Sequence, residues 1–149
     1  MNYKKTAIIF GISGQDGAYL SHLLLRKGYR VIGTTRNKSS RNLQRLKKLK
    51  IIKKIILLKG MATDLNFCKK VLNSKINEIY YLAGDSSVIK SFETPEISLK
   101  SNTEGILNIL RVLKLKKSKA KLFNAGSGQF YGDNKKNFYN IHSKIEPQS

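Results

Sequence analysis

Residues 6–17 decide the fold, and they read Thr6-Ala7-Ile8-Ile9-Phe10-Gly11-Ile12-Ser13-Gly14-Gln15-Asp16-Gly17. The first five residues form a short, mostly apolar run that is typical of a buried strand. Of the glycines that follow, Gly11 permits a tight turn, Gly14 lets the backbone approach a pyrophosphate, and Gly17 lets a helix pack closely on the strand. The phosphates would lie at the helix N-terminus, where free N–H groups and the dipole favour anions. The alternative is an ordinary glycine-rich turn.

Outward from this segment, stretches typical of strands alternate with stretches typical of helices. The expected strands are 6–10, 30–35, 55–58, 78–83 and 121–125, and the expected helices are 18–27, 64–73 and 95–114. On the last helix we expect one packing face formed by Leu99, Thr103, Ile106, Leu107, Leu110 and Leu113. This alternation predicts an α/β fold with a Rossmann-type, doubly wound parallel sheet. Because order fades after Gly132, we expect the sheet to be incomplete at the C-terminus.

The end of the second expected strand indicates which dinucleotide binds. It reads Gly33-Thr34-Thr35-Arg36, with no acidic residue. NAD enzymes place an Asp or Glu there to bind the ribose 2′-hydroxyl. Arg36 can instead pair with a 2′-phosphate through its guanidinium group, so the sequence predicts NADP. The alternative is a solvated surface arginine.

Charge is the strongest competing signal. The 149 residues carry 29 Lys and Arg against 9 Asp and Glu, a net charge of +20 that raises nucleic acid as a partner. The two main basic runs, 47–59 and 114–121, contain no aromatic residue for base stacking, and lysine dominates both. We interpret them as solvated faces. Their many lysines are consistent with a genome that favours AT-rich codons. A non-catalytic nucleic-acid-binding protein stays as an alternative.

Several classes of site are disfavoured by composition. Cys68 is the one cysteine, and His22 and His142 are the two histidines, so we expect no disulfide within the chain and no metal site. No segment approaches the ~20 apolar residues of a membrane-spanning helix. We therefore expect a cytoplasmic protein with no membrane partner.

The chain resembles the extended short-chain dehydrogenase/reductase family, and within it the GDP-mannose 4,6-dehydratases. The resemblance rests on a combination of runs rather than on one motif. These are Gly14-Gln15-Asp16-Gly17-Ala18-Tyr19-Leu20, the basic-loop residues Arg36, Ser39, Ser40, Asn42, Gln44 and Arg45, then Thr63-Asp64-Leu65, Leu82-Ala83-Gly84-Asp85-Ser86 and Ser91-Phe92-Glu93-Thr94-Pro95-Glu96. It covers only the N-terminal part of the family's domain.

The resemblance implies a redox-neutral dehydration of GDP-mannose to GDP-4-dehydro-6-deoxy-mannose. Bound NADP would exchange a hydride with the sugar, and the protein would orient the sugar and move protons. The resemblance assigns cofactor contacts to Gly11, Ser13, Gly14, Gln15, Asp16, Gly17, Arg36, Leu82, Ala83, Gly84 and Ser86. The long helix resembles one used for dimerisation, which implies a homo-oligomer for the full-length protein.

The catalytic positions match the family only in part. Ser127 falls on the hydroxyl position, but Gln129 falls where the family has a Glu that abstracts a proton. An amide has no proton-accepting capacity near neutral pH. The chain ends at Pro147-Gln148-Ser149, before the family's Tyr-x-x-x-Lys pair and its substrate domain, and Tyr139 with Lys144 has the wrong spacing to replace that pair.

Two consequences follow from these departures. Residues 1–149 are expected to form an NAD(P)-binding Rossmann domain that is inactive alone. A nucleotide-sugar epimerase or reductase, which needs no Glu at position 129, is the alternative within the same family.

Overall fold

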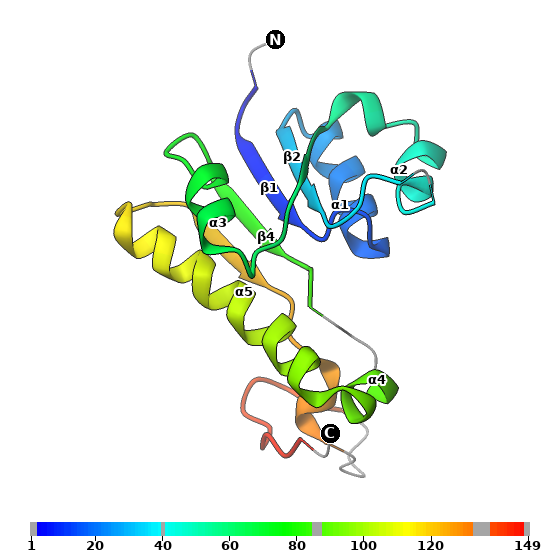
Figure 1. The fold of residues 1–149 in the computed structure, drawn as a ribbon, viewed down its shortest axis with the longest axis vertical. Coiled ribbons are helices and arrows are strands. Elements are labelled where there is room, and N and C mark those ends of the chain that lie inside the picture. The colour runs from blue at the N-terminus through cyan, green and yellow to red at the C-terminus, as the bar shows by residue number, and fades with distance from the viewer. Residues whose placement is uncertain (1–2, 40, 85–87, 133–137, 148–149) are drawn as a thin grey trace.

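The computed structural model describes residues 3–39, 41–84, 88–132 and 138–147. Within them, one parallel sheet has the strand order β3-β2-β1-β4-β5 (Figure 1). The strands are β1 (Thr6–Phe10), β2 (Arg30–Thr35), β3 (Ile56–Lys59), β4 (Glu78–Tyr81) and β5 (Lys121–Asn124). The order reverses direction at β1, as it does in a doubly wound sheet. The predicted fold class is confirmed, and the sheet is incomplete in the sense that we expected.

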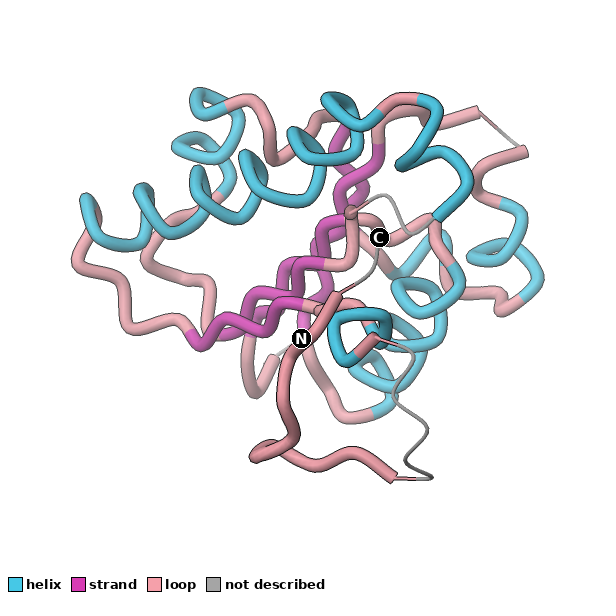
Figure 2. Tube along the Cα trace, turned by 90° about the horizontal axis from the view of Figure 1, so that it is seen from below, coloured by secondary structure: helices cyan, strands magenta, loops and turns pink. Residues whose placement is uncertain are grey.

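Helices cover both faces of the sheet (Figure 2). They are α1 (Gln15–Arg26), α2 (Gln44–Lys48), α3 (Leu65–Val71), α4 (Val88–Glu93) and α5 (Pro95–Leu115), with short 3-10 turns at Ile52–Lys54 and Gly128–Tyr131. One apolar cluster joins the sheet to α1 and α2, and a second joins it to α3 and α5. None of the described helices is long and apolar enough to cross a membrane.

The central strand β1 explains why the sheet is stable. Ala7, Ile8, Ile9 and Phe10 are all fully buried. Because side chains alternate along a strand, Ile8 and Phe10 contact the α3–α5 cluster, whereas Ala7 and Ile9 contact the α1–α2 cluster. A parallel strand covered on both faces needs this continuous apolar run.

The predicted packing face of α5 is correct for Ile106 and Leu113, which pack against the core, but wrong for most of its other residues. The predicted Leu99, Leu107 and Leu110 are 66%, 48% and 48% exposed. The buried residues of the helix are Ser98, Gly105, Asn108, Ile109 and Val112, none of which we expected on this face. Small and polar residues face the sheet because α5 comes close to it: a Cβ on Gly105 would overlap the Tyr81 side chain.

Smaller differences concern helix ends. The helix that we expected from residue 64 is α3, and Asp64 is its cap: the carboxylate accepts from the backbone N–H groups of Asn66 and Phe67 at 2.8 and 3.1 Å. The helix after the glycine turn begins at Gln15 rather than Ala18. The polar stretch 36–50 contains α2, and α4 precedes the long helix; the sequence pattern predicts neither, because both are short.

Candidate functional site

The glycine turn between β1 and α1 leaves no room for side chains. Gly11 has φ 86°, and a Cβ there would lie 2.5 Å from the backbone oxygen of Leu82. A Cβ on Gly17 would lie 2.5 Å from the backbone oxygen of Gly11 and 2.8 Å from the Cα of Ile12. Gly14 is the N-cap of α1. The turn therefore brings the start of α1 against β1 and the end of β4, the geometry that such glycines allow in dinucleotide-binding folds.

A cavity of about 310 Å³ opens at the carboxyl ends of the strands, beside this turn. Its lining includes seven of the predicted cofactor residues, which are Gly11, Ser13, Gly14, Arg36, Leu82, Ala83 and Gly84. The predicted Gln15, Asp16 and Gly17 lie in the first turn of α1 and not on this lining. The predicted Ser86 lies outside the described residues. In open α/β sheets, ligands bind at this end of the strands, where the order reverses.

Basic side chains lie at the β2 side of the cavity. Arg36 follows β2 directly and is exposed. Arg45 reaches the glycine turn, where its Nη1 lies 3.5 Å from the backbone oxygen of Ser13. Thr35 donates its hydroxyl to the backbone oxygen of Asn37 at 3.0 Å, which fixes the exit of the strand. Among the described lining residues there is no Asp or Glu, so this end of the cavity favours an anion.

Helix α5 contacts the end of β4 and the loop after it, on the side of the cavity away from β2. The Tyr81 hydroxyl donates to the backbone oxygen of Ser101 at 2.7 Å, and both residues line the cavity. Burial raises the pKa of Tyr81, so its hydroxyl is a neutral donor at physiological pH. Asn102 lies against Gly84, where a Cβ would overlap the Asn102 amide oxygen.

Of the two predicted catalytic residues, the structure describes the side chain of Ser127 only. Ser127 is exposed in the loop after β5 and is not among the lining residues. The backbone of Gln129 forms part of the 3-10 turn Gly128–Tyr131, and its side chain lies outside the described part. Their proposed roles stay predictions.

Tyr139 and Lys144, which we rejected from their spacing as a catalytic pair, each contact another side chain near the C-terminus. Lys144 forms an ion pair with Glu146. Sequence reasoning overlooked that Tyr131 stands four residues before Lys135, the family's spacing. Lys135 lies outside the described residues, and the Tyr131 ring stacks on Tyr139 with centroids 4.8 Å apart.

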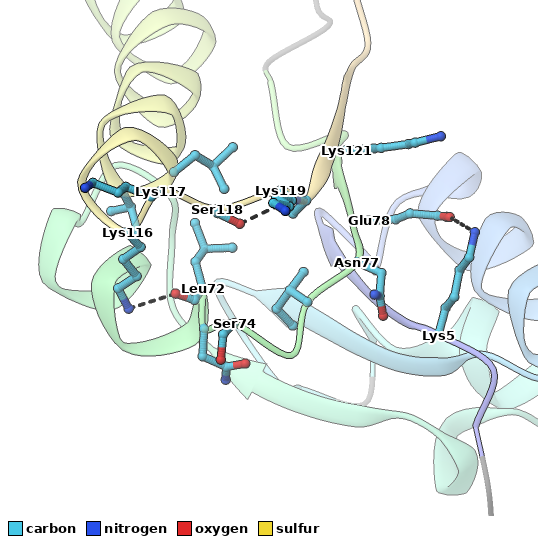
Figure 3. A pocket seen from close by; sticks show the side chains of 15 residues that line it. Lys5, Leu72, Ser74, Asn77, Glu78, Lys116, Lys117, Ser118, Lys119 and Lys121 are labelled. Atoms are coloured by element: carbon cyan, nitrogen blue, oxygen red, sulfur yellow. Dashed lines mark hydrogen bonds and ion pairs between the residues drawn. The ribbon is translucent and has the colours of Figure 1, made fainter.

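A second cavity, of about 690 Å³, lies at the amino ends of β4 and β5 and at the C-terminus of α5 (Figure 3). Three of the charged side chains on its lining, those of Lys5, Glu78 and Lys116, form hydrogen bonds within the protein. The Lys5 ammonium lies 3.1 Å from Glu78 Oε1, and the Lys116 ammonium donates to the backbone oxygens of Lys69 and Leu72, the latter at 2.8 Å.

No group of three His, Cys, Asp or Glu side chains that could hold a metal occurs in the described part. Cys68 is a buried residue of α3, and burial raises its pKa to about 11, which suits a packing role rather than a nucleophile.

Solved structures with the same arrangement define the class. The UDP-Glc/GlcNAc 4-epimerase of Campylobacter jejuni aligns over 96% of this chain and 43% of its own, with a TM-score of 0.83 at 16% identity. The dTDP-glucose 4,6-dehydratase of Bacillus anthracis, solved in complex with NAD, aligns over 97% of this chain and 45% of its own, with a TM-score of 0.78 at 19% identity. The chain is thus a domain with a Rossmann-type α/β fold.

Sequence similarity narrows the class to one family. The GDP-mannose 4,6 dehydratase family matches residues 8–149, and the chain belongs to that family. It is 36% identical over 140 residues to GDP-mannose 4,6-dehydratase of Sinorhizobium fredii, which covers 89% of this chain and 40% of the relative. It is 38% identical over 138 residues to the Vibrio cholerae enzyme, which covers 87% of this chain and 37% of the relative. The chain therefore spans about two fifths of the length of these relatives, and the predicted family is confirmed.

Proposed function

We propose that the cavity at the carboxyl ends of the strands binds NADP. The observation that carries the proposal is the position of Arg36, directly after β2 on the cavity lining, with no acidic residue among the described lining residues. The chain's own geometry fits the dinucleotide, because Gly11 and Gly17 keep the turn free of side chains where a pyrophosphate approaches. Arg36 then pairs with the 2′-phosphate, and Arg45 adds positive charge beside the turn.

The reaction we propose for the whole protein is the dehydration of GDP-mannose, a nucleotide sugar. Family membership supports it, together with the curated relatives that carry this name. NADP, when bound, accepts and returns the hydride. Within this chain, Ser127 is the hydroxyl that would orient the sugar. Gln129 cannot accept a proton, so we expect residues 1–149 alone not to convert GDP-mannose.

Titration of the 149-residue chain with NADPH and NADH, followed by cofactor fluorescence, tests the cofactor. We expect NADPH to bind at least about tenfold more tightly, because a charge-assisted hydrogen bond to phosphate contributes roughly 1.5–3 kcal/mol. Arg36→Ala should remove this preference. Arg30→Ala is the matched control, since Arg30 is an exposed arginine at the other end of the same strand.

Two results would count against the assignment. Equal affinities for NADPH and NADH in the wild-type chain would show that Arg36 does not read the 2′-phosphate. A loss of preference in Arg30→Ala as large as in Arg36→Ala would assign the effect to overall charge instead.

A further inference from the structure

Asn108 is a buried amide in the middle of α5. It is 2% exposed and lies on the face of the helix that also carries Ile109 and Val112. A buried amide destabilises a fold unless it finds hydrogen-bond partners. Its Nδ2 donates to the backbone oxygens of Ala62 and Thr63, both at 3.1 Å. Its Oδ1 accepts from Arg111 at 3.4 Å. The side chain therefore uses both of its N–H groups on one loop more than forty residues away.

That loop, residues 60–64, connects β3 to α3 and forms part of the cavity wall. Met61, Ala62 and Thr63 all line the cavity. The loop begins at Gly60, whose N–H donates to the backbone oxygen of Thr35 at 3.0 Å. It ends at Asp64, which caps α3. Asn108 holds the carbonyl groups between these two fixed ends, although it is not itself among the described lining residues.

The wall belongs to the adenosine half of the cavity. In dinucleotide-binding folds the pyrophosphate lies at the glycine turn and the adenosine ribose at the end of the second strand. Strand β3 pairs with β2 in parallel, with Lys59 beside Thr35, so the loop after β3 lies next to the end of β2. A ligand group beyond the ribose would meet residues 61–63.

We propose that Asn108 is a positioning residue that fixes this wall, so that affinity for the 2′-phosphoadenosine half depends on a side chain outside the cavity. The proposal rests on the proposed function, because it assumes that the cavity takes such a group. A purely structural role, in which Asn108 only attaches α5 to α3, is the competing explanation. The two differ in whether binding changes apart from stability.

Adenosine 2′,5′-bisphosphate is the probe, titrated calorimetrically into the 149-residue chain. Asn108→Asp keeps the shape but turns an oxygen toward two carbonyl oxygens, so we expect roughly tenfold weaker binding. Val112→Ala is the matched control, since Val112 is 1% exposed on the same helix face and its truncation creates a cavity. It should lower stability and leave the dissociation constant within about twofold of the wild type.

Hydrogen exchange without ligand gives a second, independent readout. The N–H of Asp64 donates to the backbone oxygen of Met61 at 3.2 Å, and this amide should exchange faster in Asn108→Asp but not in Val112→Ala. If Asn108→Asp does not fold, Asn108→Ser, which keeps one donor, gives the same comparison.

The outcomes separate the two proposals. Equal loss of affinity in Asn108→Asp and in Val112→Ala would overturn the positioning role, as would unchanged exchange at residues 61–64. A wild-type chain that does not bind the probe would overturn the proposed NADP site. In that case the exchange experiment still decides whether Asn108 holds the loop.

Discussion

The two ends of the sheet are formed by the same five described strands but are stabilised in different ways. At the carboxyl ends, small residues bring backbone segments close together around the cavity of about 310 Å³, and the glycine turn lies open beside Arg36. At the amino ends, the cavity is larger, about 690 Å³, and three of its charged groups, Lys5, Glu78 and Lys116, are bound to protein (Figure 3). The NADP site that we propose therefore lies at the end of the sheet with the smaller of the two cavities.

Glu78 is the centre of a hydrogen-bond network at the amino end of the sheet. Its Oε1 accepts from Lys5 and from the Tyr29 hydroxyl, both at 3.1 Å, and its Oε2 accepts from the Tyr80 hydroxyl at 2.9 Å. Burial by itself would raise the pKa of Glu78, but these hydrogen bonds outweigh it and hold the pKa below its ordinary value. A carboxylate with three donors has little capacity left for a ligand. At the amino end, the free energy of unfolding should thus fall when a hydrogen-bond partner is removed. At the carboxyl end, it should fall when a side-chain atom is added to a glycine.

The largest effect is expected at the carboxyl end, from Gly11→Ala. The new Cβ would meet the Leu82 backbone oxygen at 2.5 Å, and the residue would keep a φ of 86°. Backbone atoms cannot move aside as a flexible side chain can, so we expect a loss of roughly 3 kcal/mol or more in unfolding free energy. Chemical denaturation measures it. Gly126→Ala is the matched control, because no atom lies within 4 Å of its added Cβ, and it should change stability by less than about 0.5 kcal/mol.

A similar loss in both glycine variants would mean that the turn is not the constrained element. The comparison between the two ends of the sheet would then lose its main support. Loss of folding in Gly11→Ala with a normal Gly126→Ala would agree with the expectation.

A smaller effect is expected at the amino end, from Tyr80→Phe. Removing the hydroxyl leaves Glu78 with one donor fewer, so the free energy of unfolding should fall by about 1 kcal/mol at neutral pH. Burial, followed by the hydrogen bond to Glu78, raises the pKa of Tyr80 to about 12. The neutral hydroxyl is therefore favoured in the folded state. Its contribution is complete below the ordinary tyrosine pKa of about 10 and is lost as the pH rises through about 12.

Unfolding measured from about pH 7 to about pH 12 checks this dependence. The wild-type chain should lose stability above about pH 10 more steeply than Tyr80→Phe. Tyr19→Phe is the control, since Tyr19 is 61% exposed. Parallel alkaline curves for the wild type and Tyr80→Phe would contradict the assignment of this titration to Tyr80.

The same contrast explains which features the sequence could predict. The approach of Gly17 to Gly11 and Ile12 and the Asp64 cap depend on contacts within a few residues, so spacing alone predicts them. The network around Glu78 joins residues from three separate segments, and no local pattern marks it. The seven predicted cofactor residues that line the cavity follow from the ends of β1, β2 and β4, since parallel strands end at one edge.

The packing face of α5 could not be predicted because the helix has two candidate faces. Leucines at 99, 107 and 110 form the more apolar one, and periodicity selects it. The structure selects the other, because Gly105 allows close approach to Tyr81 and Asn108 finds carbonyl partners on a distant loop. Asn108, inside the otherwise apolar stretch 106–110, was one signal in the sequence, and it identifies a buried polar contact only once the partner is known.

The last effect, no larger than that of Tyr80→Phe, concerns the residues that follow two helices at the amino edge of the sheet. The left-handed Gly28 (φ 80°) lies two residues after α1, and the left-handed Lys117 (φ 47°) lies two residues after α5. After each, a backbone hydrogen bond to the helix closes its last turn. A side chain strains this conformation, whereas glycine adopts it freely. Lys117→Gly should therefore be more stable than Lys117→Ala by about 1 kcal/mol, and Gly28→Ala should destabilise by a similar amount. The alanine variant at 117 controls for the lost charge, and equal thermal stabilities of the two substitutions would show that the lysine conformation carries no strain.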